Sequence, residues 1–299
     1  MLKDILHFSS INTQTFDADW LKANNTRLDI LRIDKIHPVV SGNKWFKLKY
    51  YLEEAVSQNA QTIGTFGGAY SNHIIATAYA AQAIGLRCIG VIRGERPKQL
   101  SHTLRDAEEL GMHLHFVSRE EYNNAEKIKP DFPGVYWISE GGYGPVGVKG
   151  AAEILSFAND LASYTHIVCA VGTGTMLAGL ITASFPHQQV IGVSVLKNNF
   201  SIEDEVRAIL PDKHHPFKIV YDYHFGGYAK HPEELLNFMR DIWTEHRFPT
   251  DIVYTSKALY AIKDMITKHI IPQGSKVLTV HCGGLQGNLS LRPGVLPFL

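Results

Sequence analysis

The chain has 299 residues, of which 45% are hydrophobic and 19% are charged, and its 29 basic residues balance its 29 acidic ones. This composition is ordinary for a globular protein with two modest domains or one large one, and the absence of net charge offers no footprint for nucleic acid or for an anionic membrane. Cys88, Cys169 and Cys282 lie far apart without a CxxC pair, so the sequence indicates neither a disulfide framework nor a metal site.

The first part of the chain is expected to be an irregular arm over residues 1–27, which are mostly polar. Residues 1–5 lack the apolar core of a signal peptide, and no run of about 18 apolar residues occurs, so we expect a cytoplasmic protein without a membrane span. Apolar and polar residues then alternate over 27–34, which predicts a half-buried strand. Apolar residues at helical spacing predict a helix over 46–56.

Strands and helices alternate through the rest of the chain. Short apolar runs predict strands at 62–66, 87–92, 113–117, 135–139, 166–171, 190–196, 217–221 and 276–281. Helical patterns lie between them at 71–84, 102–110, 147–162, 175–184, 202–210, 232–246 and 256–269. Strands that alternate with helices of about 10–15 residues indicate parallel sheets built from β-α-β crossovers.

The alternation falls into two series, which predicts an α/β protein with two domains, each an open, mostly parallel twisted sheet flanked by helices. We expect a larger domain made of residues 1–46 and 160–299 and a smaller inserted α/β domain at 47–159. Ligands of open α/β sheets bind where strands end and helices begin. The turns that follow the strands are therefore the first places to search for a site.

One lysine, Lys44, has an unusual neighbourhood in the segment SGNKWFKLK at 41–49. It follows a Gly-Asn pair and precedes two aromatic residues, so its surroundings could be partly buried. Burial disfavours the charged ammonium and lowers the pKa of a lysine, which makes the amine a usable nucleophile. The alternative is a helix N-terminus capped by Ser41 or Asn43, with lysines that are simply solvated.

A glycine-marked turn at 67–73 (GGAYSNH) can receive an anion. Ser71 and Asn72 would cap a helix whose free N–H groups suit a carboxylate. A simple N-cap after a tight turn is the alternative. Acyl transfer by Ser71 is a weaker hypothesis, because no G-x-S-x-G elbow surrounds it.

A second glycine-marked turn follows the strand at 166–171 and can surround a phosphate with backbone N–H and hydroxyl donors at a helix N-terminus. Its residues are Gly172, Thr173, Gly174 and Thr175. Leu177 stands where a dinucleotide fingerprint needs glycine, and no lysine follows as in a nucleotide P-loop. A compact cofactor phosphate passes both checks, while a close strand-to-helix turn is the structural alternative.

Two further segments carry polar groups near strand or helix ends. Cys282 precedes Gly283-Gly284 after the last strand, where no second ligand lies at metal-site spacing, so a free thiol in a cofactor pocket is expected. Tyr254 and Thr255 put a phenol and a hydroxyl just ahead of a helix. A tyrosine that is merely packed is the alternative for Tyr254.

Four motifs occur together in one known order: Lys44 after Gly-Asn, the turn at 67–73, the turn at 172–175 and the Tyr-Thr-x-Lys segment at 254–257. With them, the sequence resembles the pyridoxal-phosphate family of 1-aminocyclopropane-1-carboxylate deaminases and D-cysteine desulfhydrases over about residues 34–287. The resemblance implies the two-domain fold type II of the tryptophan synthase β subunit. It also implies pyridoxal 5'-phosphate as cofactor, a small amino acid as substrate and a homodimer.

The resemblance also implies roles for individual residues. Lys44 would bind the cofactor covalently, and Asn72 would contact its 3-hydroxyl group. Ser71 would receive the substrate carboxylate and assist proton transfer. The segment 172–175 would hold the phosphate group.

The resemblance assigns the remaining positions to the tyrosines and to the pyridine ring. Tyr228, in the segment Phe225-Gly226-Gly227-Tyr228, and Tyr254 match two active-site tyrosines, and Thr255 and Cys282 fall at positions that approach the pyridine nitrogen. Deaminases that open the cyclopropane ring carry Glu in place of Thr255, whereas the desulfhydrases carry Thr there and also in place of Cys282.

A neutral partner stabilises a protonated pyridine ring less than a carboxylate does, which favours expulsion of a β-substituent. The sequence therefore predicts a pyridoxal-phosphate-dependent lyase that converts a small D-amino acid such as D-cysteine to pyruvate, ammonia and sulfide. The alternative within the family is deamination of 1-aminocyclopropane-1-carboxylate to 2-oxobutyrate and ammonia. A non-catalytic cofactor-binding protein is the alternative from another class.

Overall fold

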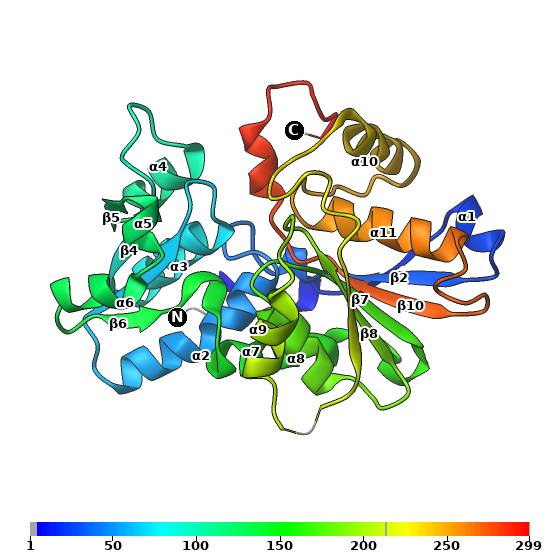
Figure 1. Ribbon diagram of the computed structural model, residues 1–299, viewed down its shortest axis with the longest axis horizontal. Helices are drawn as coiled ribbons and strands as arrows, with labels where there is room; N and C mark the ends of the chain where they lie inside the picture. Colours follow the sequence, from blue (N-terminus) through cyan, green and yellow to red (C-terminus); the bar gives the residue numbers. More distant parts are fainter. Residues whose placement is uncertain (1–4, 213, 299) are drawn as a thin grey trace.

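The computed structural model describes residues 5–212 and 214–298, so the first four residues of the expected arm lie outside the described part. The described chain forms two separate sheets with helices around them (Figure 1). One sheet takes its strands from residues 13–31 and 166–280, and the other from residues 62–138. Two mostly parallel sheets confirm the predicted α/β class, while domain boundaries at 46/47 and 159/160 stay predictions.

The larger sheet has six strands in the order β1-β2-β10-β7-β8-β9. Their bounds are β1 Thr13–Phe16, β2 Arg27–Leu31, β7 His166–Val171, β8 Gln189–Ser194, β9 Phe217–Val220 and β10 Lys276–Val280. Only the edge strand β1 is antiparallel to its neighbour among these pairs. Parallel neighbours need crossovers, and these are the helices that pack on the two faces.

The smaller sheet has four parallel strands in the order β5-β4-β3-β6. Their bounds are β3 Thr62–Gly67, β4 Arg87–Arg93, β5 Met112–Val117 and β6 Tyr136–Ile138. Strand β3 is buried along its whole length, as expected for a central strand covered on both faces.

Helices of very different length connect the strands. Their bounds are α1 Asp19–Lys22, α2 Asn43–Ser57, α3 Asn72–Ile84, α4 His102–Glu109, α5 Arg119–Tyr122, α6 Ala125–Ile128, α7 Pro145–Ala152, α8 Thr175–Ala183, α9 Ile202–Ile209, α10 Glu233–His246 and α11 Thr255–Thr267. Those with apolar residues on one side only, such as α9 and α10, lie at the surface with that side turned inward.

Alternation along β7 divides the core of the larger sheet into two layers. Ile167, Cys169 and Val171 point to the face that packs against α8, whereas Val168 and Ala170 point to the face covered by α10 and α11. Successive side chains of a strand point to opposite faces, so an uninterrupted apolar strand can fill both layers at once. Both faces of this strand are therefore sealed from water.

Helix α7 is wedged between α2 and α8. A Cβ atom on Gly150 would lie 1.8 Å from the carbonyl oxygen of Phe46 in α2, and one on Gly179 of α8 would lie 2.4 Å from the Cβ of Ala151. Glycine is therefore required where these helix backbones touch. This contact couples the start of α2, which carries Lys44, to the helix that follows the turn at 172–175.

The irregular arm predicted for residues 1–27 is wrong over part of its length. Thr13–Phe16 form β1, which pairs with β2 with Thr13 opposite Leu31 and Phe16 opposite Leu28. The Thr-Gln-Thr pattern is too short and too polar to announce a strand by itself. Pairing with an edge formed by residues further along the chain decides the conformation.

The helix predicted over 147–162 is also shorter than expected. Helix α7 ends at Ala152, and short 3₁₀ helices at Glu153–Phe157 and Leu161–Ser163 follow it. Asp160 lies between them with φ 51°, a left-handed conformation that Asp tolerates better than most residues. The chain therefore turns where the apolar pattern alone suggested a continuous helix.

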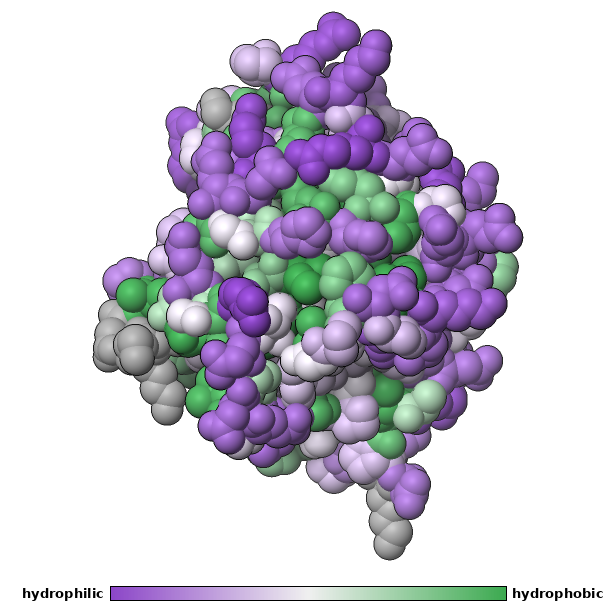
Figure 2. All heavy atoms as spheres, turned by 90° about the vertical axis from the view of Figure 1, so that its left-hand side faces the viewer, coloured by the Kyte–Doolittle hydropathy of each residue, from purple (hydrophilic) through white to green (hydrophobic). Residues whose placement is uncertain are grey.

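The described surface is mixed in character. Figure 2 shows the face on the left-hand side of Figure 1, where hydrophobic side chains gather near the centre within a frame of hydrophilic ones. Among the residues that the structure describes, no helix has the length and apolar content needed to cross a membrane.

Candidate active site

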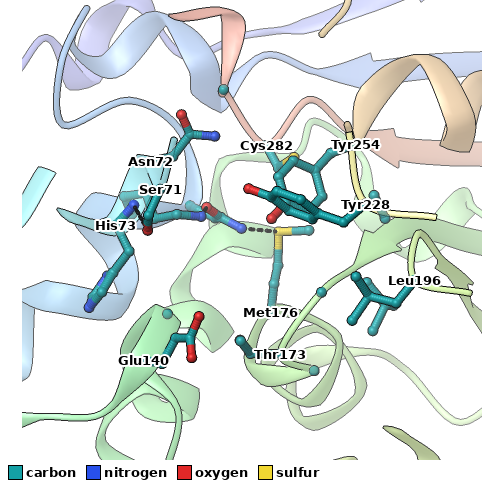
Figure 3. Close-up of a pocket in the computed structure, with 18 of the residues that line it drawn as sticks. Ser71, Asn72, His73, Glu140, Thr173, Met176, Leu196, Tyr228, Tyr254 and Cys282 are labelled. Carbon is teal, nitrogen blue, oxygen red and sulfur yellow. Dashed lines mark hydrogen bonds between the residues drawn. The ribbon is translucent and has the colours of Figure 1, made fainter. Parts of the chain in front are cut away.

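A cavity of about 500 Å³ lies between the two sheets (Figure 3). Its lining includes residues at or just after the carboxyl ends of six parallel strands: Gly68, Arg93, Glu140, Gly172, Leu196 and Cys282. Ligands of open α/β sheets bind at this end of the strands, where helix N-termini also point. The position of the cavity follows from the topology of both sheets.

Most of the predicted site residues line this cavity. They are Lys44, Ser71, Asn72, Gly172, Thr173, Gly174, Tyr228, Tyr254 and Cys282. Thr175 and Thr255 do not line it; each is buried and directly follows a lining residue, Gly174 or Tyr254. The fold thus brings together residues that lie far apart in the sequence, such as Lys44 and Cys282.

Lys44 lies in the first turn of α2, and its side chain faces the cavity. Its Nζ donates a hydrogen bond to Asn43 Oδ1 at 2.7 Å and lies 5.9 Å from the centre of the Tyr254 ring. Burial lowers the pKa of Lys44, an effect that the nearby Cys282 and Asp251 partly oppose. A lysine whose pKa is lowered offers a larger fraction of free amine at neutral pH.

The loop after β10 holds the start of α2 in place. Gly42 has φ 60°, and a Cβ atom there would lie 2.1 Å from the carbonyl oxygen of Cys282. The same oxygen accepts a hydrogen bond from the N–H group of Asn43 at 3.2 Å. Gly42 is therefore required for the position of Lys44, because any other residue would push α2 away from this loop.

Cys282 is a buried thiol beside the two lysines of the cavity. Burial, together with the charge of Asp251, raises its pKa to about 12, although the nearby Lys44 and Lys47 oppose the shift. The side chain is consequently a protonated thiol at neutral pH, not a thiolate.

Ser71 caps α3, whose N-terminus points at the cavity. Its Oγ accepts hydrogen bonds from the N–H groups of His73 at 3.2 Å and Ile74 at 3.4 Å. Since both oxygen lone pairs have partners, the hydroxyl hydrogen is left to be donated elsewhere. The side chain of Asn72 is oriented by Gln286, whose Nε2 donates to Asn72 Oδ1 at 2.7 Å.

The N-terminus of α8 forms the opposite end of the cavity. Gly174 stands at its cap with φ 79° and supplies no side chain to bond the first helical N–H groups. Such groups have no acceptor within the helix and favour an anion. The hydroxyl groups of Thr173 and Thr175 lie 3.4 Å apart beside them.

A second lysine, Lys47, enters the same cavity one helical turn after Lys44. Its side chain is 4% exposed, and burial lowers its pKa well below the ordinary value, with the charge of Lys44 adding to the effect. Two ammonium groups so close disfavour each other, and a nearby dianion would restore the charge of both. Lys47 and the N-terminus of α8 line the same cavity, where both would favour an anion.

Two tyrosines close another side of the cavity (Figure 3). The rings of Tyr228 and Tyr254 are nearly perpendicular, with centres 6.3 Å apart. Burial raises the pKa of Tyr254 well above its usual value, and the pKa of Tyr228 is also raised by burial. Both phenols are consequently protonated at neutral pH and can donate hydrogen bonds.

Thr255 begins α11 and is held by a buried carboxylate. Its hydroxyl donates to Asp251, which is 0% exposed and also accepts from the N–H groups of Val253, Tyr254 and Thr255. The N–H group of Asp251 donates back to Thr255 Oγ1 at 2.8 Å. A full negative charge thus stands directly behind the neutral hydroxyl.

Sequence reasoning missed several residues of this site. Lys47 had a usable signal, because its spacing of three residues from Lys44 puts both on one helix face. Arg93 and Glu140 also line the cavity, each at or after a strand end, and Tyr122 donates to Glu140 Oε2 at 2.9 Å. Asp251 lies four residues before Thr255, a spacing that carries no signal without the loop geometry.

The residues present fit a pyridine aldehyde that carries a phosphate group. Such a molecule needs a free amine, an anion site and flat walls for an aromatic ring. Lys44 offers the amine, Lys47 and the N-terminus of α8 offer the anion site, and Tyr254 offers an aromatic wall. Gly172 allows that wall to approach, since a Cβ atom there would lie 3.3 Å from Tyr254 Cε1.

Known proteins are similar to this one over most of the chain. The profile of the family described as "Pyridoxal-phosphate dependent enzyme" matches residues 12–283. The mitochondrial bifunctional D-cysteine desulfhydrase/1-aminocyclopropane-1-carboxylate deaminase of Arabidopsis thaliana is 30% identical over 298 residues, 88% of this chain and 74% of that protein. The 1-aminocyclopropane-1-carboxylate deaminase of Bradyrhizobium sp. (strain ORS 278) is 26% identical over 284 residues, 82% of each protein.

A solved structure agrees with the sequence comparisons. The crystal structure of an ACC deaminase homologue superimposes with a TM-score of 0.80 and is 27% identical, covering 93% of this chain and 90% of the other. The family profile spans both sheets and the residues that line the cavity up to Gly283. The chain therefore belongs to the family of pyridoxal-phosphate-dependent enzymes, which confirms the cofactor expected from its sequence.

Proposed function

We propose that the protein is a lyase that eliminates the β-substituent of a small D-amino acid, so that D-cysteine and water give pyruvate, ammonia and hydrogen sulfide. The observation that carries this proposal is the placement of Lys44, a lysine with a lowered pKa, in one cavity with an anion site and with the capped N-terminus of α3. When bound, pyridoxal phosphate supplies an electron sink for the negative charge that develops at the substrate Cα atom.

Lys44 would have two tasks. It would hold the cofactor through its amine and, once the substrate amine has replaced it, accept the proton from Cα. A general base is most effective when its pKa lies near the working pH, and burial moves Lys44 in that direction. Lys47 and the N-terminus of α8 would hold the phosphate group, which anchors the ring while Lys44 is free.

Ser71 would orient the substrate carboxylate. Its oxygen already accepts from two N–H groups, so its hydroxyl hydrogen is available for a carboxylate oxygen. The N-terminus of α3 adds partial positive charge at the same place. Tyr254 and Tyr228, both protonated, would donate a hydrogen bond or a proton to the leaving group.

The relatives favour two substrates. One relative is named as a desulfhydrase as well as a deaminase, and another as a deaminase alone. Thr255 is neutral, and the carboxylate of Asp251 lies behind it with its oxygens occupied by hydrogen bonds, which supports elimination over ring opening. Deamination of 1-aminocyclopropane-1-carboxylate is the alternative that the relatives' names support.

A substrate panel tests the proposal. Release of pyruvate or 2-oxobutyrate is measured with D-cysteine, L-cysteine, D-serine and 1-aminocyclopropane-1-carboxylate. We expect D-cysteine to have the highest kcat/KM. Turnover of the cyclopropane acid alone would contradict the reading of Thr255, and a bound cofactor without turnover of any substrate would favour a non-catalytic cofactor-binding protein.

Substitution of Lys44 by Ala tests the central residue. The visible absorbance of the lysine-bound cofactor should disappear, and turnover should fall by at least about 100-fold. Retention of that absorbance in Lys44→Ala would exclude Lys44 as the cofactor lysine.

A homodimer and a cytoplasmic location, both expected from the sequence, stay predictions of the same proposal. Light scattering of the purified protein gives the mass in solution, and a mass of one chain would contradict the dimer. Cell fractionation tests the location.

A further inference from the structure

Lys257 is a buried lysine that belongs to the Tyr-Thr-x-Lys segment but does not line the cavity. Lys257 is 0% exposed, and its Nζ donates hydrogen bonds to the carbonyl oxygens of His224 at 2.9 Å and Gly227 at 2.7 Å. A buried ammonium is unfavourable unless its donors have partners. Both partners here lie in one loop, about 30 residues earlier in the chain.

The first carbonyl opens a tight turn. The N–H group of Gly227 donates to His224 O at 3.0 Å, and the two residues between them, Phe225 and Gly226, have φ 52° and 94°. Positive φ at both central residues characterises a type I′ turn, which strongly prefers Gly or Asn over Phe. His224 Nδ1 also accepts from the N–H group of Gly226 at 2.8 Å.

The second carbonyl opens the next turn. The N–H group of Lys230 donates to Gly227 O at 3.2 Å, and Ala229 at the third position has φ 54°. This conformation is also unfavourable for a residue with a side chain. Lys257 thus bonds the first carbonyl of two consecutive turns that the local sequence alone would not favour.

Tyr228 stands inside the second of these turns. It is 41% exposed, lines the cavity and makes its perpendicular ring contact with Tyr254 (Figure 3). Burial at its phenol raises its pKa, while 41% of the residue remains exposed, so the backbone of the loop largely sets where the ring lies. Its place beside Tyr254 therefore depends on the backbone of residues 224–230.

The same helical turn holds both tyrosines. Tyr254 directly precedes α11, and Lys257 lies in the first turn of this helix. The helix therefore positions Tyr254 through the backbone, and it positions the loop that carries Tyr228 through the hydrogen bonds of the Lys257 ammonium. Burial lowers the pKa of Lys257 to about 8, and the buried carboxylate of Asp251 opposes this shift.

We propose that Lys257 is a positioning residue that holds the loop 224–230 in its two-turn conformation and thereby keeps Tyr228 beside Tyr254 in the active site. The part that concerns catalysis rests on the proposed function, whereas the part that concerns the loop does not. A lysine that merely filled the core would affect global stability but not this loop in particular.

The test compares the holoenzymes of wild type, Lys257→Met, Tyr228→Phe and the double variant. Methionine keeps the volume and removes the donors. Hydrogen exchange of the peptide spanning 224–230 should become roughly 10-fold faster in Lys257→Met, with the cofactor absorbance unchanged. On the best substrate of the panel, kcat should fall by about as much as in Tyr228→Phe, roughly 100-fold, and no further in the double variant.

A matched control is Lys263→Met, which removes an exposed lysine of the same helix. The Nζ of Lys263 lies 5.7 Å from the ring centre of Phe238. This variant should leave loop exchange and kcat unchanged. Gly227→Ala perturbs the loop directly, because Gly227 has φ 120°, which a residue with a side chain does not tolerate. It should reproduce both effects of Lys257→Met even if the latter does not fold.

Wild-type exchange of the loop in Lys257→Met, or full turnover in Gly227→Ala, would overturn the proposal. If the losses in kcat of the two single variants multiplied in the double variant, the proposal would also fail, because Lys257 and Tyr228 would then act independently. If no substrate of the panel turns over, the proposed function fails, and the exchange rates alone then decide the role of Lys257.

Discussion

At the scale of single residues, the site depends on two lysines in one turn of α2. Lys44 and Lys47 both face the cavity, and burial lowers the pKa of each. A bound anion would relieve the repulsion between their charged forms, and the N-terminus of α8 in the same cavity also favours an anion. A cofactor phosphate would pair with Lys47 and leave Lys44 free to act as an amine.

Lys47→Met is therefore expected to weaken cofactor binding without removing the covalent attachment at Lys44. A hydrogen bond to a charged group contributes about 1.5–3 kcal/mol, so cofactor affinity should fall by roughly 10- to 100-fold. Titration of the cofactor-free protein with pyridoxal phosphate, followed by absorbance, measures this loss. The saturated variant should still show the visible band.

Lys49→Met is the matched control for Lys47. Lys49 lies two residues further on α2 and does not line the cavity. Its Nζ forms an ion pair with Glu153 Oε2 at 2.7 Å. Its removal should leave cofactor affinity unchanged. An equal loss in both variants would mean that charge in general, and not a phosphate contact of Lys47, is measured.

At the scale of elements, α7 couples the two ends of the cavity. It packs against α2, which carries both lysines, and against α8, which begins directly after the turn at 172–175. The contact uses glycine to bring helix backbones together at Gly150 and Gly179. A displacement of α7 would move the amine and the anion site relative to each other.

Gly150→Ala should destabilise the protein because its Cβ atom would lie 1.8 Å from the carbonyl oxygen of Phe46. Overpacking of a well-packed contact costs about 1–3 kcal/mol, and backbone cannot move aside as a side chain can. Urea unfolding of the cofactor-free protein measures the loss. Cofactor affinity should fall as well, since α2 is displaced.

Gly287→Ala serves as the control, because no atom lies within 4 Å of a Cβ added there. It should change the free energy of unfolding by less than about 0.5 kcal/mol. A Gly150→Ala protein as stable as this control would contradict the close contact between α2 and α7.

At the scale of the whole molecule, the cavity is shared between the two sheets. Ser71 and Asn72 come shortly after strand β3 of the smaller sheet, whereas the turn at 172–175 comes directly after strand β7 of the larger one. Gln286, beyond the last strand of the larger sheet, donates directly to Asn72 and so joins the two sides. A ligand that contacts both sides is bound only by the assembled fold.

Removal of the cofactor should therefore lower the thermal unfolding midpoint. A ligand present at about 100 times its dissociation constant stabilises the native state by about 2.7 kcal/mol. For a chain of this size, that corresponds to a shift of several degrees, measured by calorimetry or circular dichroism. Added pyridoxal phosphate should restore the midpoint, and inorganic phosphate at the same concentration should not. Equal midpoints with and without cofactor would contradict a site shared by both sheets.

Most of the strands and helices, and the turns that line much of the cavity, could be predicted from the sequence. Strand β7 and helices such as α3 and α8 announce themselves through local periodicity and through the glycines that bound them. The turns at 67–73 and 172–175 also carry their signal locally, because a helix N-terminus after a strand needs those residue types. Lys44 could be found because its unusual neighbours are adjacent in the chain.

Only the tertiary structure decided which other side chains reach the cavity and what holds them there. Strand β1 exists because β2 offers an edge, and Lys257 acquires its partners from a loop about 30 residues away. The charge behind Thr255 depends on how the backbone folds Asp251 onto the start of α11. Such contacts depend on distances between segments that are remote in the chain or folded by a loop, and periodicity along a sequence carries no information about those distances.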